Sequence, residues 1–109
     1  MAYSEETALR LRDIFGARDD VEEKKMFGGI AFMVKGHMCC GITGDELMLR
    51  VGPAGQEEAL RRPHTREMDF TGRPMKGYVF VAAEGFATPE ALAEWVARAE
   101  AFVSTLPPR

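Results

Sequence analysis

The sequence predicts a two-layer α+β fold, with an antiparallel sheet of about five or six strands flanked by one helix near each end of the chain. Short apolar runs over residues 24–51 are separated by glycine-containing pairs, which is typical of strands joined by hairpins. Apolar residues at helical spacing occupy residues 4–15 and 88–106, on either side of the strands. Helices at both ends of an antiparallel run of strands give a two-layer α+β arrangement.

The first predicted helix begins after Ser4 and ends before Gly16. Ser4 can cap the helix, and the carboxylates of Glu5 and Glu6 in the first turn favour its dipole. Gly16 is a natural stop. We expect one face of this helix to pack on the sheet, because its apolar residues recur at spacings of three and four: Ala8, Leu11, Ile14 and Phe15.

The strands are expected at residues 24–27, 30–35, 38–43, 46–51, 66–70 and 78–81. In 46–51 the alternation places Leu47, Leu49 and Val51 on one face, with Met48 and Arg50 on the other, so we expect one buried sheet face. A short helix opens at Pro53 and cannot continue past Pro63.

The last helix is capped by Thr88, with Pro89 at its first position. Glu94 and Arg98 are spaced to pair across one exposed turn. The helix carries a continuous apolar stripe made of Leu92, Trp95, Val96, Ala99, Phe102, Val103 and Leu106.

The chain has the size and composition of one globular domain, residues 1–109, with 46% hydrophobic and 28% charged residues. No apolar stretch approaches the roughly 20 residues of a membrane helix. The amino terminus is interrupted by Glu5, Glu6 and Arg10, unlike the apolar region of a secretory signal. We therefore expect a cytoplasmic protein.

The two cysteines, Cys39 and Cys40, are adjacent in the sequence. On an extended strand their side chains would point to opposite faces, which disfavours a disulfide between them. The lack of a disulfide framework suits a reducing compartment.

The charge of the chain is distributed unevenly along it. Residues 24–80 hold nine basic and six acidic side chains, whereas residues 1–23 hold three and seven, and residues 81–109 hold two and four. The middle is therefore mildly basic and both ends are acidic. A nucleic-acid-binding protein usually carries a much stronger basic stripe, so an ordinary solvated surface is the simpler interpretation.

Several ordered segments together resemble the TfoX/Sxy N-terminal domain family. These are Met-Phe-Gly-Gly at 26–29 after Lys25, the apolar run 32–34 with Gly36 and Met38, the strand 47–51, and Gly-Arg-Pro-Met at 72–75 before Tyr78. The family motif residues, which we expect to be mainly structural, are Met26, Phe27, Gly28, Gly29, Gly36, Gly72, Arg73, Pro74 and Met75.

This resemblance implies a compact domain with an antiparallel sheet, similar to the secretion-chaperone type of fold. It also implies a role in transcription regulation, since two-domain relatives regulate competence for DNA uptake together with the cyclic-AMP receptor protein. Because the sequence ends at Arg109, we expect a short, stand-alone member without the helical C-terminal domain of those relatives. The competence role therefore does not transfer directly.

The remaining motifs have structural interpretations that are simpler than functional ones. Gly28-Gly29 could bind an anion, but the pair opens a strand rather than a helix, so a tight hairpin is favoured. The acidic pairs Asp19-Asp20 and Glu22-Glu23 are typical of a solvated loop before the first strand. Most methionines are expected to fill the core, although methionine-rich surfaces can also adapt to partners.

Four residues could in principle carry metal or thiol chemistry: His37, Cys39, Cys40 and His64. Structural zinc sites use cysteines separated by two to four residues, and no such pair exists. A nucleophilic cysteine needs a nearby oriented base, whereas a cysteine on an apolar strand usually behaves as a small hydrophobe. We predict no catalytic residue, no metal and no cofactor.

The leading hypothesis is a non-enzymatic regulatory domain that binds a protein partner, either a regulator or the transcription machinery. The residues expected to meet an acidic partner are Arg50, Arg66, Arg73 and Lys76, the last two in an exposed turn. One alternative is direct nucleic-acid binding by the basic middle segment, and another is a small-molecule enzyme. A homodimer, formed by pairing of two copies through a sheet edge or the second sheet face, is a further alternative.

Overall fold

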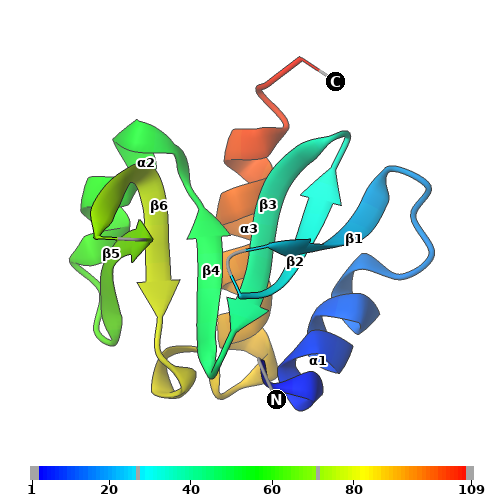
Figure 1. Ribbon diagram of the computed structural model, residues 1–109, viewed down its shortest axis with the longest axis horizontal. Helices are drawn as coiled ribbons and strands as arrows, with labels where there is room; N and C mark the ends of the chain where they lie inside the picture. Colours follow the sequence, from blue (N-terminus) through cyan, green and yellow to red (C-terminus); the bar gives the residue numbers. More distant parts are fainter. Residues whose placement is uncertain (1–2, 27, 71, 108–109) are drawn as a thin grey trace.

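A computed structural model of the chain describes residues 3–26, 28–70 and 72–107, apart from the side chains of Phe70, Arg73 and Pro74. In this part of the chain, six antiparallel strands form one sheet with the order β1-β2-β3-β4-β6-β5 (Figure 1). The predicted α+β fold is confirmed. The strands are β1 (Val21–Met26), β2 (Gly29–Val34), β3 (His37–Thr43), β4 (Glu46–Arg50), β5 (Thr65–Phe70) and β6 (Arg73–Val81).

The helices are α1 (Glu5–Phe15), α2 (Gly52–Leu60) and α3 (Pro89–Val103), with a 3-10 turn η1 at Ala83–Phe86 before α3. The predicted caps are confirmed, since the hydroxyl of Ser4 accepts a hydrogen bond from Thr7 N at 3.2 Å and that of Thr88 accepts one from Ala91 N at 3.1 Å. None of the helices in the described residues is long and apolar enough to cross a membrane.

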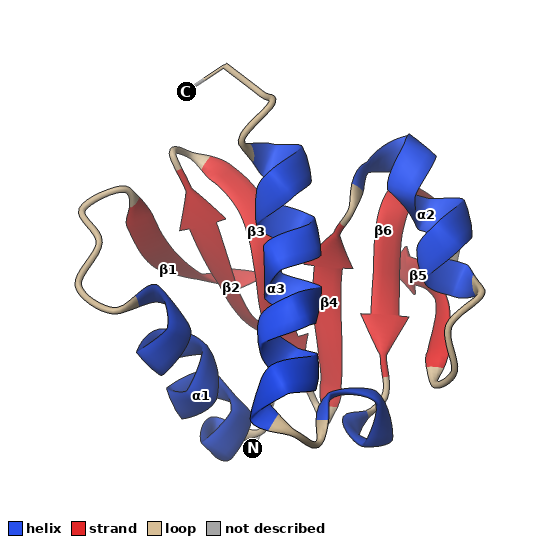
Figure 2. Ribbon diagram, turned by 180° about the vertical axis from the view of Figure 1, so that it is seen from behind, coloured by secondary structure: helices blue, strands red, loops and turns tan. Residues whose placement is uncertain are grey.

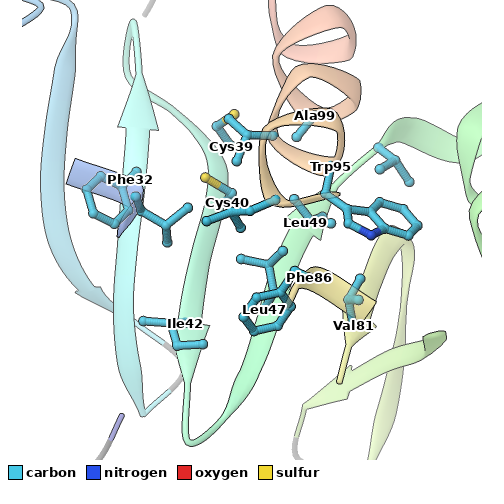
Figure 3. Close-up of a cluster of buried hydrophobic side chains, with 14 of the residues drawn as sticks. Phe32, Cys39, Cys40, Ile42, Leu47, Leu49, Val81, Phe86, Trp95 and Ala99 are labelled. Carbon is cyan, nitrogen blue, oxygen red and sulfur yellow. The ribbon is translucent and has the colours of Figure 1, made fainter. Parts of the chain in front are cut away.

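Helices α1 and α3 lie together on one face of the sheet (Figure 2). The main core fills the space between this helix layer and the sheet, as the close-up of its central side chains shows (Figure 3). Leu47 and Leu49 of β4 pack in this core together with Val51, as predicted from their alternation. Phe15 of α1 stacks on Phe32 of β2 with ring centroids 5.4 Å apart, which fixes the helix on the strand.

The opposite face of the sheet carries a second cluster of buried side chains, and all of its described members come from strands. Met48, predicted to lie on the less buried face of β4, has no exposed surface because it belongs to this cluster. Most of the methionines therefore fill a core, as expected. The cluster consists of Ala31, Met38, Met48, Met68 and Phe80, with Met26, Met33, Met75 and Tyr78 packed against it at partial burial.

The prediction that Cys39 and Cys40 point to opposite faces is wrong. Phe32 pairs with Cys40 and Met33 pairs with Met38, so Cys39 is an extra residue in β3 and forms a β-bulge. A bulge places two consecutive residues opposite one partner and interrupts the alternation of side chains. Both cysteines consequently pack in the main core (Figure 3), and both thiols are free.

Three smaller predictions are also corrected by tertiary contacts. Strand β1 begins at Val21, so Glu22 and Glu23 belong to a strand rather than a loop, and Glu23 accepts two hydrogen bonds from Arg12 of α1. Ile14 remains 38% exposed instead of being buried with the apolar face of α1. In α3, Glu94 and Arg98 do not pair with each other, because Arg62 and Glu58 are their partners.

Candidate partner-binding site

Arg66, one of the four predicted partner-binding residues, is already occupied within the fold. Its guanidinium donates two hydrogen bonds to the carboxylate of Glu46, at 2.7 and 2.9 Å, and a longer one to Asp69 at 3.5 Å. It also lies 4.4 Å above the centre of the Phe80 ring. These bonds to Glu46 raise the pKa of Arg66 above its ordinary value. Arg66 thus joins β5 to β4 and offers little to a partner.

Arg50, at the end of β4, has a different environment. Its guanidinium lies 5.6 Å from the ring centre of Tyr78 on β6 and 5.6 Å from that of Phe102 on α3. Among the described residues, no carboxylate forms an ion pair with it. Aromatic faces attract a cation but leave the in-plane N–H donors of a guanidinium unused. Arg50 is therefore a half-buried cation that contacts two aromatic rings and, among the described residues, leaves its N–H donors unpaired.

A close approach of two backbone segments holds this part of the molecule together. Val51 N donates to Gly77 O at 2.8 Å, and a side chain at Gly77 would come within 3.2 Å of the backbone of Gly52 and Pro53. The amide of Gln56 in α2 accepts a hydrogen bond from Gly77 N at 3.1 Å and donates one to Tyr78 O, also at 3.1 Å. The start of α2 is thereby fastened to β6.

Lys76 lies one residue before this contact, as Arg50 lies one residue before Val51. Its side chain is exposed and, within the described residues, forms no ion pair. The prediction that Arg73 and Lys76 lie in an exposed turn is wrong, because β6 begins at Arg73 and Lys76 lies within that strand. We name the pair Arg50 and Lys76, with the rings of Tyr78 and Phe102 beside Arg50, the cationic corner. The side chain of Arg73 lies outside the described residues.

A family model of the TfoX N-terminal domain matches residues 13–103. The chain belongs to the TfoX N-terminal domain family. The match covers α3 and every strand of the sheet, so it includes the elements that form the cationic corner. Comparison with curated proteins gave no match, and comparison with solved structures gave none either.

The motif glycines of this TfoX N-terminal domain occupy turns and close contacts. Gly28 has a φ of +75° next to the β1–β2 hairpin, and a side chain at Gly29 would collide with the backbone of Ile42 and Thr43 in β3. Gly36 and Gly72 also have positive φ and lie in turns before strands. Met26 and Met75 pack against the second cluster. Phe27 and the side chain of Pro74 lie outside the described residues.

The candidates for metal or thiol chemistry do not come together in this domain. His37 Nε2 lies 2.6 Å from Pro107 O, whereas His64 is exposed in the turn before β5. In the described part of the chain, no three His, Cys, Asp or Glu side chains are placed to hold a metal ion. A hydrogen bond with Cys39, followed by burial, raises the pKa of Cys40 well above its ordinary value, which disfavours the reactive thiolate.

Two residues of the cationic corner, Tyr78 and Phe102, were not predicted as site residues, and neither was Gln56, which fastens α2 to β6 beside it. The sequence places Tyr78 in a strand and at the end of the family pattern, and Phe102 in the apolar stripe of the last helix. Phe102 is 52 positions from Arg50 in the sequence, so no local pattern connects them. The one available signal was Gly77, since a glycine inside a strand often marks a close backbone approach.

Proposed function

We propose that this TfoX N-terminal domain is a non-enzymatic, regulatory protein-interaction domain that binds an acidic segment of its partner at the cationic corner. The observation that carries the proposal is that Arg50 contacts aromatic rings but has no carboxylate partner among the described residues. Its guanidinium lies 5.6 Å from the centre of each of two aromatic rings, and no carboxylate among the described residues neutralises it. The comparison with Arg66, whose donors are taken by Glu46 and Asp69, supports the choice of Arg50.

Preorganisation makes Arg50 well suited to a carboxylate ligand. A free arginine loses side-chain entropy when it is fixed in one geometry, whereas the contacts with Tyr78 and Phe102 already restrict Arg50. A guanidinium presents its N–H donors in a planar fork that matches two carboxylate oxygens. Lys76 adds a second charge close by without a fixed geometry. An Asp- or Glu-rich segment would meet both.

The non-enzymatic part of the proposal is supported by the state of the cysteines. Cys39 and Cys40 have no exposed surface, and a raised pKa keeps the Cys40 thiol protonated at neutral pH. The regulatory part rests on membership of the TfoX N-terminal domain family. We place the interaction in transcription regulation because of that family.

The experiment compares two variants that remove the same charge. Arg50→Gln with Lys76→Gln removes the cationic corner, and Lys24→Gln with Arg61→Gln removes two exposed cations elsewhere. Each tagged protein is used to capture partners from nuclease-treated lysate of the source cells. We expect a protein that is retained by the wild type and by the Lys24/Arg61 variant, and is lost with the Arg50/Lys76 variant. Equal retention by both variants would show that the corner is not the binding site.

The same capture without nuclease tests the alternative of nucleic-acid binding. Binding to phosphates weakens steeply as salt rises from about 50 to about 200 mM, because condensed counterions are released. The protein-partner proposal is wrong if three results are found together: only nucleic acid is retained, its retention falls over this salt range, and the Arg50/Lys76 variant does not retain it. The corner is then a phosphate-binding surface.

A further inference from the structure

A groove on the helix side of the domain lies between α1 and the start of α3. The two helices share one face of the sheet and diverge from each other along it (Figure 2). The hollow between them has a volume of about 270 Å³ and is lined by Arg10, Asp13 and Ile14 of α1 and by Pro89 and Leu92 of α3. This is below the ~300–1,000 Å³ of a typical small-molecule site, and it suits one or two anchoring side chains.

The apolar lining residues of the groove are Ile14, Pro89 and Leu92, and they lie beside the charged Arg10 and Asp13. Ile14 is 38% exposed; Leu9, which is also on α1 but does not line the groove, is 59% exposed. In the described residues the only other large hydrophobic side chain with comparable exposure is Leu60 on α2. Leu92 is 99% buried and provides the floor. The exposed residues Ala93 and Ala97 follow on α3 and leave room for a close approach.

Arg10 fixes the geometry of the groove. Its guanidinium donates hydrogen bonds to three consecutive carbonyls at the entry to α3, those of Phe86, Ala87 and Thr88, at 2.9, 3.5 and 3.3 Å. It also lies 5.8 Å from the centre of the Phe86 ring. The residue therefore ties α1 to the N-terminus of α3. The groove is formed before any ligand arrives, which lowers the cost of binding.

The charges around Arg10 are acidic. Asp13 lines the groove, while Glu6 and Asp45 line a second hollow that shares Arg10 with it. None of these three carboxylates has an ion-pair partner among the described residues. The nearby Arg12 is paired with Glu23 of β1, to which it donates two hydrogen bonds. Arg10 keeps its own positive charge, because its hydrogen bonds go to carbonyls and not to carboxylates. Around the two hollows that share Arg10, the three carboxylates exceed this one cation, so the region combines the exposed side chain of Ile14 with a net negative charge.

We propose that this groove binds a basic amphipathic helix of a partner protein. An aliphatic side chain of that helix inserts between Ile14 and Leu92, and its lysines or arginines face Asp13, Glu6 and Asp45. Apolar anchors with complementary flanking charges are the usual way in which a groove recognises a helix. The groove is distinct from the cationic corner, and the two hollows that share Arg10 carry a net negative charge. The domain therefore has two surfaces for two kinds of partner, and the groove is tested independently of the corner.

The probe is a synthetic peptide of about 18 residues, five turns of helix, with leucines on one face and lysines on the other. Its affinity is measured by fluorescence anisotropy for the wild type and for two matched pairs of variants. Ile14→Ser is compared with Leu60→Ser, because Ile14 and Leu60 are equally exposed at 38% and 37%. Asp13→Lys is compared with Glu67→Lys, an exposed acidic residue on β5.

We expect Ile14→Ser to weaken peptide binding about tenfold, as loss of one anchoring contact would. Asp13→Lys should weaken it about fivefold at low salt, and the effect should shrink as salt rises. Leu60→Ser and Glu67→Lys should leave the affinity within about twofold. Thermal unfolding of each variant separates a folding defect from a binding defect.

The proposal also predicts where the peptide binds. Amide shifts of the ¹⁵N-labelled protein should change in α1 and in the first turns of α3, and not at β5. Three results would overturn it: equal losses for Ile14→Ser and Leu60→Ser, equal or tighter binding of the same peptide with glutamates in place of lysines, or no binding of the lysine peptide. None of these results would count against the proposal for the cationic corner, since that site is tested with different variants and a different ligand.

Discussion

Gly52 is the position where a single added methyl group should do the most damage near the cationic corner. Its φ is +83°, and a Cβ at this position would lie 2.3 Å from Cδ1 and 2.6 Å from Cε1 of the Phe102 ring. The ring cannot simply move aside, because its other neighbours include the main core and the guanidinium of Arg50. Gly52→Ala therefore combines backbone strain with a steric collision.

The size of the effect follows from these two contributions. A left-handed conformation costs a residue with a Cβ about 1–2 kcal/mol, and overpacking a filled site costs about 1–3 kcal/mol more. We expect Gly52→Ala to lower the free energy of unfolding by about 3 kcal/mol. For a chain of 109 residues, 1 kcal/mol corresponds to about 4 °C in Tm. The expected decrease in Tm is thus about 12 °C.

Gly72 provides a matched control. Its φ is +79°, nearly that of Gly52, but a Cβ there would meet no atom within 4 Å. Gly72→Ala should therefore cost only the strain, about 1–2 kcal/mol, or roughly 4–8 °C in Tm. Both variants are measured by thermal and urea unfolding, followed by circular dichroism. The difference between them isolates the collision with Phe102.

A double-mutant cycle tests the collision directly. In a Phe102→Ala background the ring is absent, so Gly52→Ala should cost no more than Gly72→Ala does in the wild type. The reasoning is refuted if Gly52→Ala and Gly72→Ala are equally destabilising, or if removing the ring does not reduce the cost of Gly52→Ala. Because Arg50 rests on the same ring, Gly52→Ala should also weaken binding of an acidic partner.

Two further predictions follow from the perturbed pKa values. The raised pKa and complete burial of Cys40 predict that thiol reagents at neutral pH react only as fast as the protein unfolds; rapid labelling of the native protein would contradict this. A hydrogen bond from Arg18 lowers the pKa of Asp20 below its ordinary value near 3.8. The stability that this hydrogen bond contributes is present above pH 3.8 and is lost as pH falls through the folded-state pKa. In the Asp20→Asn variant, the free energy of unfolding measured in urea should therefore fall less steeply as the solution is acidified. An equally steep decrease in the variant and the wild type would contradict this prediction.

Features set by short stretches of sequence were predictable for this chain. The caps at Ser4 and Thr88 and the stop at Gly16 depend on residues within one turn of helix, and all three are present in the structure. The alternation of Leu47 and Leu49 likewise identified the face of β4 that packs on the helices. Local backbone geometry and side-chain period are sufficient for such features.

Features set by the relative placement of elements were not predictable. The alternation rule assumes uninterrupted pairing, so the bulge at Cys39, which depends on the register against β2, reverses the expected direction of one cysteine. Helical periodicity gives the face of α1 but not its angle to α3, and that angle leaves Ile14 exposed in the groove. The charge count of residues 24–80 could not reveal that Glu46 neutralises Arg66, because the two residues are 20 positions apart.

Arg50 and Arg66 show how strand register decides which of two similar cations is available to a ligand. Both lie over an aromatic ring of β6, since Arg50 pairs with Tyr78 and Arg66 pairs with Phe80. The register of β4 then places Glu46 beside Arg66. Among the described residues, no carboxylate lies in ion-pair distance of Arg50. A guanidinium whose donors are filled by carboxylates stabilises the sheet, whereas one on aromatic faces with unused donors can still bind a carboxylate. This difference, which depends on pairing across the sheet, separates two of the four predicted partner-binding residues: Arg50 stays in the candidate site, whereas Arg66 stabilises the sheet.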